Sequence, residues 1–326
     1  MKGRLGALIK AAVTLLLFYL LFRKMDFRQL GATMAGARLV MLLAAFLLLW
    51  VAHFICIFRW RMLMRPLMPT FSVRRLFEIY CIGLFFNLTF PTAVGGDVVK
   101  IYYAGKPSRL FAQSFAATFL DRDAGMLAMM IIAGTATLVM PVHVAGIPVV
   151  FLVWISFAAF IAVNIVIFMP SLHRLLTRIL HRVRLSKTAG RVDAISSAFQ
   201  VMGRHPAILL CALFISLINQ FLVLTVSWVT AKALDLDVAF LYFLVVIPVI
   251  TLISMIPISL NGYGLREYAF VSLFTAIGVT RESAFALGII GSVMILLSAV
   301  PGGMLYMFFR NRDDMRQMAV METELR

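Results

Sequence analysis

Long stretches of the chain are apolar on every helical face, and short polar segments separate them. Six of these stretches are each long enough to cross about 30 Å of hydrocarbon as a helix. They cover residues 6–22, 39–58, 110–140, 147–168, 207–230 and 284–309. Membrane β-strands would instead alternate apolar and polar positions over about ten residues. The pattern therefore predicts an all-α polytopic membrane protein with about six full transmembrane helices, because helices satisfy their own backbone hydrogen bonds in lipid.

Two further apolar segments, residues 76–104 and 239–277, are broken by proline and glycine. The first breaks at Pro91 and Gly95-Gly96, and the second breaks at Pro257 and at the glycines that follow it. Short arms favour a re-entrant helical hairpin for the first segment, whereas the second is long enough either to re-enter or to cross. Each segment lies between two full spans, and the two halves have opposite orientations. The sequence therefore predicts an inverted repeat, an architecture typical of transporters.

This pattern divides a single integral membrane domain, residues 1–326, into parts. The first repeat covers residues 39–140, and a connecting span with a basic loop covers 141–205. The second, inverted repeat covers residues 206–310, and a charged tail covers 311–326. Short loops rich in Lys and Arg usually face the cytoplasm. The basic segments 59–75, 171–204 and the tail from 310 therefore place both termini in the cytoplasm, although the loop 23–38, with four basic residues, then lies outside.

The N-terminal apolar run has the charged start of a signal peptide. Arg23, Lys24 and Met25 follow it where a cleavage site needs small residues. We therefore interpret the run as a retained first span.

The composition agrees with a membrane protein and excludes several other classes. Apolar residues make up 63% of the chain and charged residues 13%, whereas soluble proteins have about 45–50% and about 25%. The net charge of +16 lies mostly in loops beside apolar segments, which indicates attraction to anionic headgroups and not to nucleic acid. The three cysteines show no paired spacing, and HExxH, GxSxG and P-loop motifs are absent from the sequence. We expect no cofactor and no metal site.

The two breaks have the same order of features. Proline ends one half-helix, glycines permit unusual backbone angles, and a new half-helix begins with opposite charges in its first turns. The residues concerned are Pro91, Gly95, Gly96, Asp97 and Lys100 in the first break, and Pro257, Asn261, Gly262, Gly264, Arg266 and Glu267 in the second. Helix N-termini attract anions, so we predict that both breaks, hinged at the prolines, bind a phosphate near mid-membrane. The alternative is that both are turns at the membrane surface, with Asp97 and Glu267 as ordinary first-turn acids.

A third charged cluster, Asp121-Arg122-Asp123, interrupts the apolar pattern of residues 110–140. If the span is centred on residues 113–133, the cluster is buried and Arg122 binds a phosphate or an acid. If the span begins at Gly125, the cluster lies at the interface. Ionisable residues at membrane depth are costly and usually functional.

Four segments of the chain resemble a known family: GLFFNLTFPTAVGGDVVKIYYAGK at 83–106, FLDRDAGM at 119–126, IPISLNGYGLREYAF at 256–270 and PGG at 301–303. In this order they are similar to the flippase-like family that forms the transmembrane region of lysylphosphatidylglycerol synthases, and the resemblance extends over nearly the whole chain. It implies a protein of the bacterial cytoplasmic (inner) membrane that moves a lipid between leaflets. Some members carry a C-terminal synthase domain, and the chain resembles the stand-alone members.

The resemblance also assigns individual residues. The first glycine motif of the family corresponds to Gly95, Gly96, Asp97 and Lys100, and the arginine of the following helix corresponds to Arg122. The second motif corresponds to Pro257, Gly262, Gly264, Arg266 and Glu267. The chain departs from the family pattern in having Lys100 where arginine is frequent, and Leu260-Asn261 where another glycine is often seen.

Three functions follow, and the first is favoured. A translocase without enzymatic activity would bind an anionic phospholipid or a polyprenyl-phosphate-linked lipid. Three cations would neutralise its phosphate: Lys100, Arg122 and Arg266. Three acids would hold those cations when the site is empty, or would recognise a positively charged headgroup: Asp97, Asp121 and Glu267. Its movement would be passive or coupled to an ion. The second function is a membrane enzyme with Asp97 or Asp121 as base. The third is a non-transporting partner of a lipid-synthesis or glycosyltransferase complex. The sequence leaves a homo-oligomer open.

Overall fold

The computed structural model describes residues 2–23, 25–69, 71–90, 94–140, 143–144, 147–169, 186–256, 258–259 and 262–324. The predicted hinges Pro91 and Pro257, the predicted site residue Asn261 and much of the basic loop 171–204 lie outside these residues. Within them the chain forms twelve α-helices and a short hairpin of strands β1 (His143–Val144) and β2 (Ile147–Pro148). The prediction of an all-α protein is confirmed.

Five helices of the described chain are long and apolar enough to cross a membrane. They are α3 (Leu39–Met64), α6 (Phe111–Val139), α7 (Val149–Phe168), α10 (Pro206–Ala233) and the first part, Arg281–Phe308, of α13 (Arg281–Glu324). They correspond to five of the six predicted spans. The remaining predicted span is α1 (Lys2–Phe22), whose section Lys10–Phe22 counts as a shorter apolar helix. The chain is therefore a multi-pass membrane protein.

Each of the two broken segments forms a pair of short helices. The first pair is α4 (Val73–Thr89) with α5 (Gly95–Gly105), and the second is α11 (Phe240–Met255) with α12 (Leu265–Thr275). At 1.5 Å per residue, the 11-residue helices α5 and α12 are each about 17 Å long, too short to cross the hydrocarbon alone. The breaks are therefore present as predicted, while re-entry and the inverted repeat stay predictions.

Helix α3 is longer than its predicted span. The sequence pattern ended this span at residue 58 and assigned Arg59 to a cytoplasmic loop, which is wrong. The helix continues to Met64, and Arg59 is only 4% exposed. An arginine can remain inside the bundle here because other helices supply polar partners for it.

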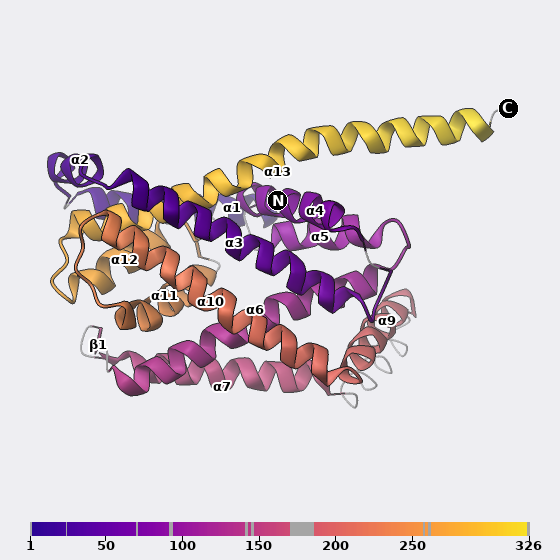
Figure 1. Cartoon of the computed structure of the whole chain (residues 1–326), viewed down its shortest axis with the longest axis horizontal. Helices are drawn as coiled ribbons and strands as arrows, with labels where there is room; N and C mark the ends of the chain where they lie inside the picture. The colour runs from indigo at the N-terminus through magenta and orange to yellow at the C-terminus, as the bar shows by residue number, and fades with distance from the viewer. Residues whose placement is uncertain are drawn as a thin grey trace.

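The remaining described helices lie at the edges of the bundle. Helix α2 (Phe27–Ala35) begins at Asp26, whose carboxylate accepts the backbone N–H groups of Arg28 and Gln29. Helix α9 (Ser186–Gly203) packs near one end of α6 and α10 (Figure 1). Helix α13 continues beyond the bundle and carries most of the predicted tail (Figure 1).

Close approaches between helices occur at glycines. A Cβ atom on Gly302 of α13 would lie 1.8 Å from the carbonyl oxygen of Cys81 on α4. A Cβ atom on Gly96 of α5 would lie 2.0 Å from the carbonyl oxygen of Gly83 on α4. Membrane helices pack closely where small residues let their backbones approach. Helix α4 therefore has α5 and α13 tightly packed against it.

Candidate functional site

Asp97, on the first full turn of α5, joins two predicted cations. The Lys100 Nζ atom lies 2.9 Å from Oδ1 of Asp97, one turn along the same helix, and the Arg122 guanidinium of α6 binds the other carboxylate oxygen. Asp97 and Lys100 are buried, whereas the Arg122 side chain is 33% exposed. The structure thus brings Arg122, from the third charged cluster of the sequence, to Asp97 and Lys100 of the first break.

Asp121, the residue before Arg122, pairs with a cation that sequence reasoning missed. The Nε atom of Arg59 lies 2.7 Å from Oδ1 of Asp121, and both side chains are almost completely buried. The Arg59 guanidinium also donates to the Ser216 hydroxyl of α10 at 2.6 Å. Four of the five residues that follow Arg59 as far as Met64 are apolar, the exception being Arg61, and they were the available signal that the helix continues. Asp121 therefore lies inside the bundle, while the position of the charged cluster relative to the membrane stays a prediction.

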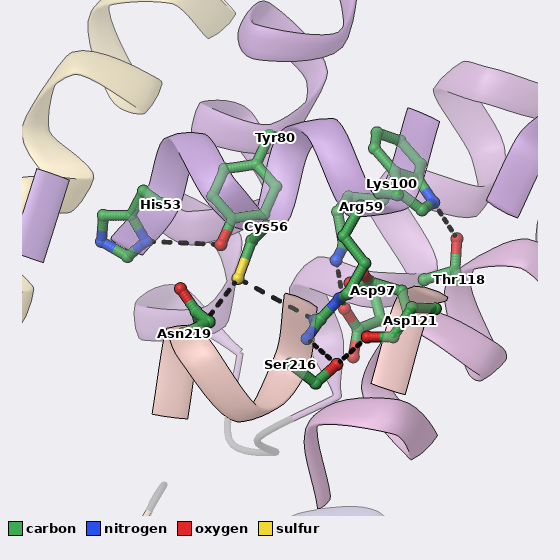
Figure 2. A network of polar contacts seen from close by, with 12 residues as sticks. His53, Cys56, Arg59, Tyr80, Asp97, Lys100, Thr118, Asp121, Ser216 and Asn219 are labelled. Carbon is green, nitrogen blue, oxygen red and sulfur yellow. Dashed lines mark hydrogen bonds and ion pairs between the residues drawn. The ribbon is translucent and has the colours of Figure 1, made fainter. Parts of the chain in front are cut away.

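Aromatic side chains surround Lys100. Its Nζ atom lies 5.5 Å from the ring centroid of Trp60 and 5.4 Å from that of Tyr80. The Trp60 indole donates to the Thr118 hydroxyl. The Tyr80 hydroxyl lies 3.3 Å from Nδ1 of His53 (Figure 2). Cations are attracted to aromatic faces, and more so when water is excluded. These rings hold Lys100 without neutralising its charge.

The polar contacts continue toward α10 through a thiol. The Asn219 amide and the Arg59 guanidinium both approach Sγ of Cys56, at 3.5 and 3.9 Å (Figure 2). The Oδ1 atom of Asn219 and the Nε2 atom of His53 are buried and have no hydrogen-bond partner. No group of three or more potential metal ligands occurs among the described residues. Cys56 is therefore part of a polar network and does more than fill space.

We name Arg59, Asp97, Lys100, Asp121 and Arg122 the α5–α6 cluster. Its three cations and two carboxylates leave one positive charge in excess, and four of the five residues are buried. Burying charges inside a membrane bundle costs free energy that pairing only partly offsets. An excess positive charge buried among these helices favours the binding of an anion.

The second break holds a separate charged group on α12 and α13. Arg266 lies 3.4 Å from the Glu267 carboxylate and donates to the Ser292 hydroxyl, which donates to Glu267 at 2.8 Å. The Arg266 guanidinium also lies 5.6 Å from the Tyr263 ring centroid. Glu267 is fully buried, whereas the Arg266 side chain is 22% exposed, and together they carry no net charge. We name Arg266, Glu267 and Ser292 the α12–α13 cluster.

Internal acceptors already occupy backbone N–H groups at both breaks. The Gly96 N–H donates to Oδ1 of Asn87 at 2.8 Å, and the Gly264 N–H donates to Oε2 of Glu267 at 2.7 Å. Gly264, with φ +78°, adopts the left-handed region that favours glycine. An anion at either half-helix would therefore use the remaining N–H groups or replace the internal acceptor.

The two clusters are separate in the structure. The α5–α6 cluster is built by α3, α5 and α6 with Ser216 of α10, whereas the other is built by α12 and α13. Within the described ranges, no hydrogen bond or ion pair joins a residue of one cluster to Arg266 or Glu267 of the other. The binding of one phosphate by both breaks stays a prediction.

Apolar spanning helices around buried, paired charges define a polytopic helical membrane protein with a polar interior. Residues 7–303 match the family model described as the lysylphosphatidylglycerol synthase TM region, and the chain belongs to this family. The resemblance predicted from the motifs is confirmed, and the matched range includes both clusters. No curated protein and no solved structure matched the chain.

Proposed function

We propose that the protein is a lipid translocase that moves a phosphate-bearing or anionic lipid between the leaflets of the bacterial cytoplasmic membrane. The observation that carries the proposal is the α5–α6 cluster. Among the spanning helices it holds three cations, Arg59, Lys100 and Arg122, which pair with only two carboxylates. Soluble domains bury such charges rarely, and membrane proteins keep them mainly where ions or polar substrates pass. Both termini would face the cytoplasm.

Exchange of ion pairs explains how a headgroup would bind. Arg122 is the most exposed cation of the cluster, and it already shares the Asp97 carboxylate with Lys100. A lipid phosphate approaching Arg122 would replace one carboxylate oxygen as its partner, while Lys100 continues to neutralise Asp97. The acyl or prenyl tails would remain in lipid, so only the headgroup enters the polar interior.

The two helical hairpins supply the second element of the proposal. The hairpin of α4 and α5 and the hairpin of α11 and α12 each carry an ion pair near the start of their second helix. In an inverted repeat the two hairpins would open to opposite leaflets. Arg266 would then receive the phosphate on the other side. The sequence contains no P-loop, so the movement is passive or driven by an ion.

The test is lipid exchange in proteoliposomes containing a fluorescent phosphatidylglycerol analogue that an external reductant quenches. Arg122→Ala should lower the initial rate about tenfold, the equivalent of about 1.4 kcal/mol of lost stabilisation. Arg266→Ala should lower it as well. The control is Arg74→Ala, because the Arg74 side chain is 80% exposed and pairs only at the surface of α4. Equal rates for Arg122→Ala, Arg266→Ala and the control would contradict the proposal.

The non-transporting alternative makes the opposite prediction. A partner of a lipid-synthesis or glycosyltransferase complex needs a stable bundle but no excess buried charge. Neutral substitutions at Lys100 and Arg122 that preserve folding would then leave its function unchanged. A membrane enzyme that uses Asp97 or Asp121 as base would need that carboxylate free, whereas each is held by a cation.

A further inference from the structure

A groove on the surface of the bundle runs between α6, α7 and α10. It has a volume of about 420 Å³ and is lined almost entirely by apolar side chains, among them Leu127, Ile161 and Leu213. Asp123 of α6 and Asn164 of α7 are its polar members, and Asp123 is the one ionisable residue among the described residues that line it. We name this feature the α6–α7 groove.

Asp123 lies in the middle part of helix α6. It is 12 residues after Phe111, where the helix begins, and 16 residues before Val139, where it ends. At 1.5 Å per residue these distances are about 18 and about 24 Å. A carboxylate among the apolar side chains of this groove is costly unless it is paired or neutralised.

The neighbours of Asp123 in the chain are paired, but Asp123 is in no ion pair within the described ranges. Asp121 binds Arg59, and Arg122 binds Asp97. The contact found for the Asp123 side chain is a hydrogen bond with Asn164, which also donates to the backbone oxygen of Phe160. The carboxylate therefore depends on one neutral partner from α7.

The helices that pack on α6 bring no free cation to the groove. Helices α7 and α11 contain no Asp, Glu, Lys, Arg or His, and the α10 residues that line the groove are apolar. Among the described residues, the other helices packed against α6 carry these charged groups: Arg59, Asp97 and Lys100 in the α5–α6 cluster, Arg61 on α3, Lys187 and the exposed Arg191 and Asp193 on α9, and Lys232 on α10, which pairs with Asp237. None of the described side chains among them lines the groove. His205 lies before α10 and is exposed.

A proton neutralises such a carboxylate without a second charged residue. A neutral carboxylic acid can donate to an amide oxygen, and a carboxylate can accept from an amide nitrogen, so Asn164 can hydrogen-bond to either form. Helix α7 packs mainly on α6 and exposes most of its surface, as its place at the edge of the bundle shows (Figure 1). A small displacement of α7 would therefore widen the groove beside Asp123.

We propose that Asp123 is a proton-binding site whose protonation accompanies each movement of lipid; this inference rests on the proposed function. The carboxylate takes up one proton from water when the α6–α7 groove opens and becomes a neutral acid. The acid lies in the closed groove, and the same proton returns to water on the other side of the membrane when the groove opens there. No other bond changes, and a proton gradient then biases the lipid movement.

Proteoliposomes of phosphatidylcholine and phosphatidylglycerol, with a fluorescent phosphatidylglycerol analogue, test this coupling. An imposed proton gradient should change the wild-type rate several-fold. Asp123→Asn, which is permanently neutral, should abolish this response, while Asp123→Glu should keep it. Asp237→Asn is the control, because Asp237 is fully exposed on the loop after α10, and it should respond like the wild type. A response of Asp123→Asn equal to that of the wild type would overturn the proposal, as would a wild-type rate independent of the gradient.

A second measurement separates this inference from the proposed function. If the wild type moves no lipid under any condition, the translocase proposal fails. Infrared difference spectra of the wild type minus Asp123→Asn then decide the proton site by themselves. A carboxylic acid band that titrates across the neutral pH range supports proton binding at Asp123. Identical spectra for the two proteins would exclude it.

Discussion

Arg59 on α3 and Asp121 on α6 form an ion pair of 2.7 Å between residues 62 positions apart in the chain. The Ser216 hydroxyl of α10 accepts a second hydrogen bond from the same guanidinium, so one arginine connects three spanning helices. Because α3, α6 and α10 surround the α5–α6 cluster, this pair contributes both to the packing of the bundle and to the charge of the site.

Removing Arg59 should therefore destabilise the protein strongly. Arg59→Ala leaves the buried Asp121 carboxylate without its cation, a change that costs about 3–5 kcal/mol in buried pairs. Thermal unfolding in detergent, together with Asp121→Ala and the double variant, measures the coupling between the two side chains.

The exposed ion pair of Arg38 and Asp235 is the control for this double-mutant experiment. Its side chains are 59% and 81% exposed, so Arg38→Ala should cost at most about 1 kcal/mol. A similar loss of stability in Arg59→Ala and Arg38→Ala would show that burial does not determine how much Arg59 contributes to stability.

Gly302 and Gly291 give a matched comparison on one helix. Gly302→Ala should lower the unfolding temperature, because the new methyl group would meet the Cys81 carbonyl at 1.8 Å and force α13 away from α4. Gly291→Ala meets nothing within 4 Å and should be neutral or stabilising by up to about 1 kcal/mol, since alanine favours helix more than glycine. Equal unfolding temperatures for the two variants would contradict the close packing of α4 and α13.

Gly262 and Gly278 separate backbone strain from steric overlap. Both have positive φ angles, +80° and +86°, so alanine at either position costs about 1–2 kcal/mol of conformational strain. A Cβ atom on Gly262 would also lie 2.8 Å from the Ser254 carbonyl oxygen, whereas Gly278 has open space around it. Gly262→Ala should therefore lower both stability and lipid movement more than Gly278→Ala does. Denaturant unfolding and the proteoliposome rates check the two effects, and the reverse order would exclude a closely packed second break.

Substitutions of Lys100 should distinguish its charge from its size. Lys100→Arg keeps a cation beside Asp97 and between the rings of Trp60 and Tyr80, so most of the lipid movement should remain. Lys100→Met fills a similar space without the charge and should lower the rate about tenfold at similar stability. The proteoliposome rates decide this point, and unfolding curves confirm that both variants are folded. Equal rates for the two variants would show that the charge of Lys100 has no role.

The apolar pattern alone identified the class of protein, most of the spans and both breaks. Hydropathy depends on each residue and its near neighbours, so it indicates where a helix can cross and where Pro and Gly interrupt one. The i, i+3 spacing of Asp97 and Lys100 likewise anticipates a contact along one helix, and the structure has it at 2.9 Å. The family motifs in the sequence included both of these residues.

Contacts between distant helices were decided only by the tertiary structure. A local pattern ends a span at the first arginine, because it cannot show that Asp121 and Ser216 will stabilise Arg59 inside the bundle. For the same reason the sequence did not show that Arg122 pairs with Asp97, or that Asp123 lies in an apolar groove. The free energy of a buried charge depends on partners brought by other helices, and that information is absent from the sequence around any single residue.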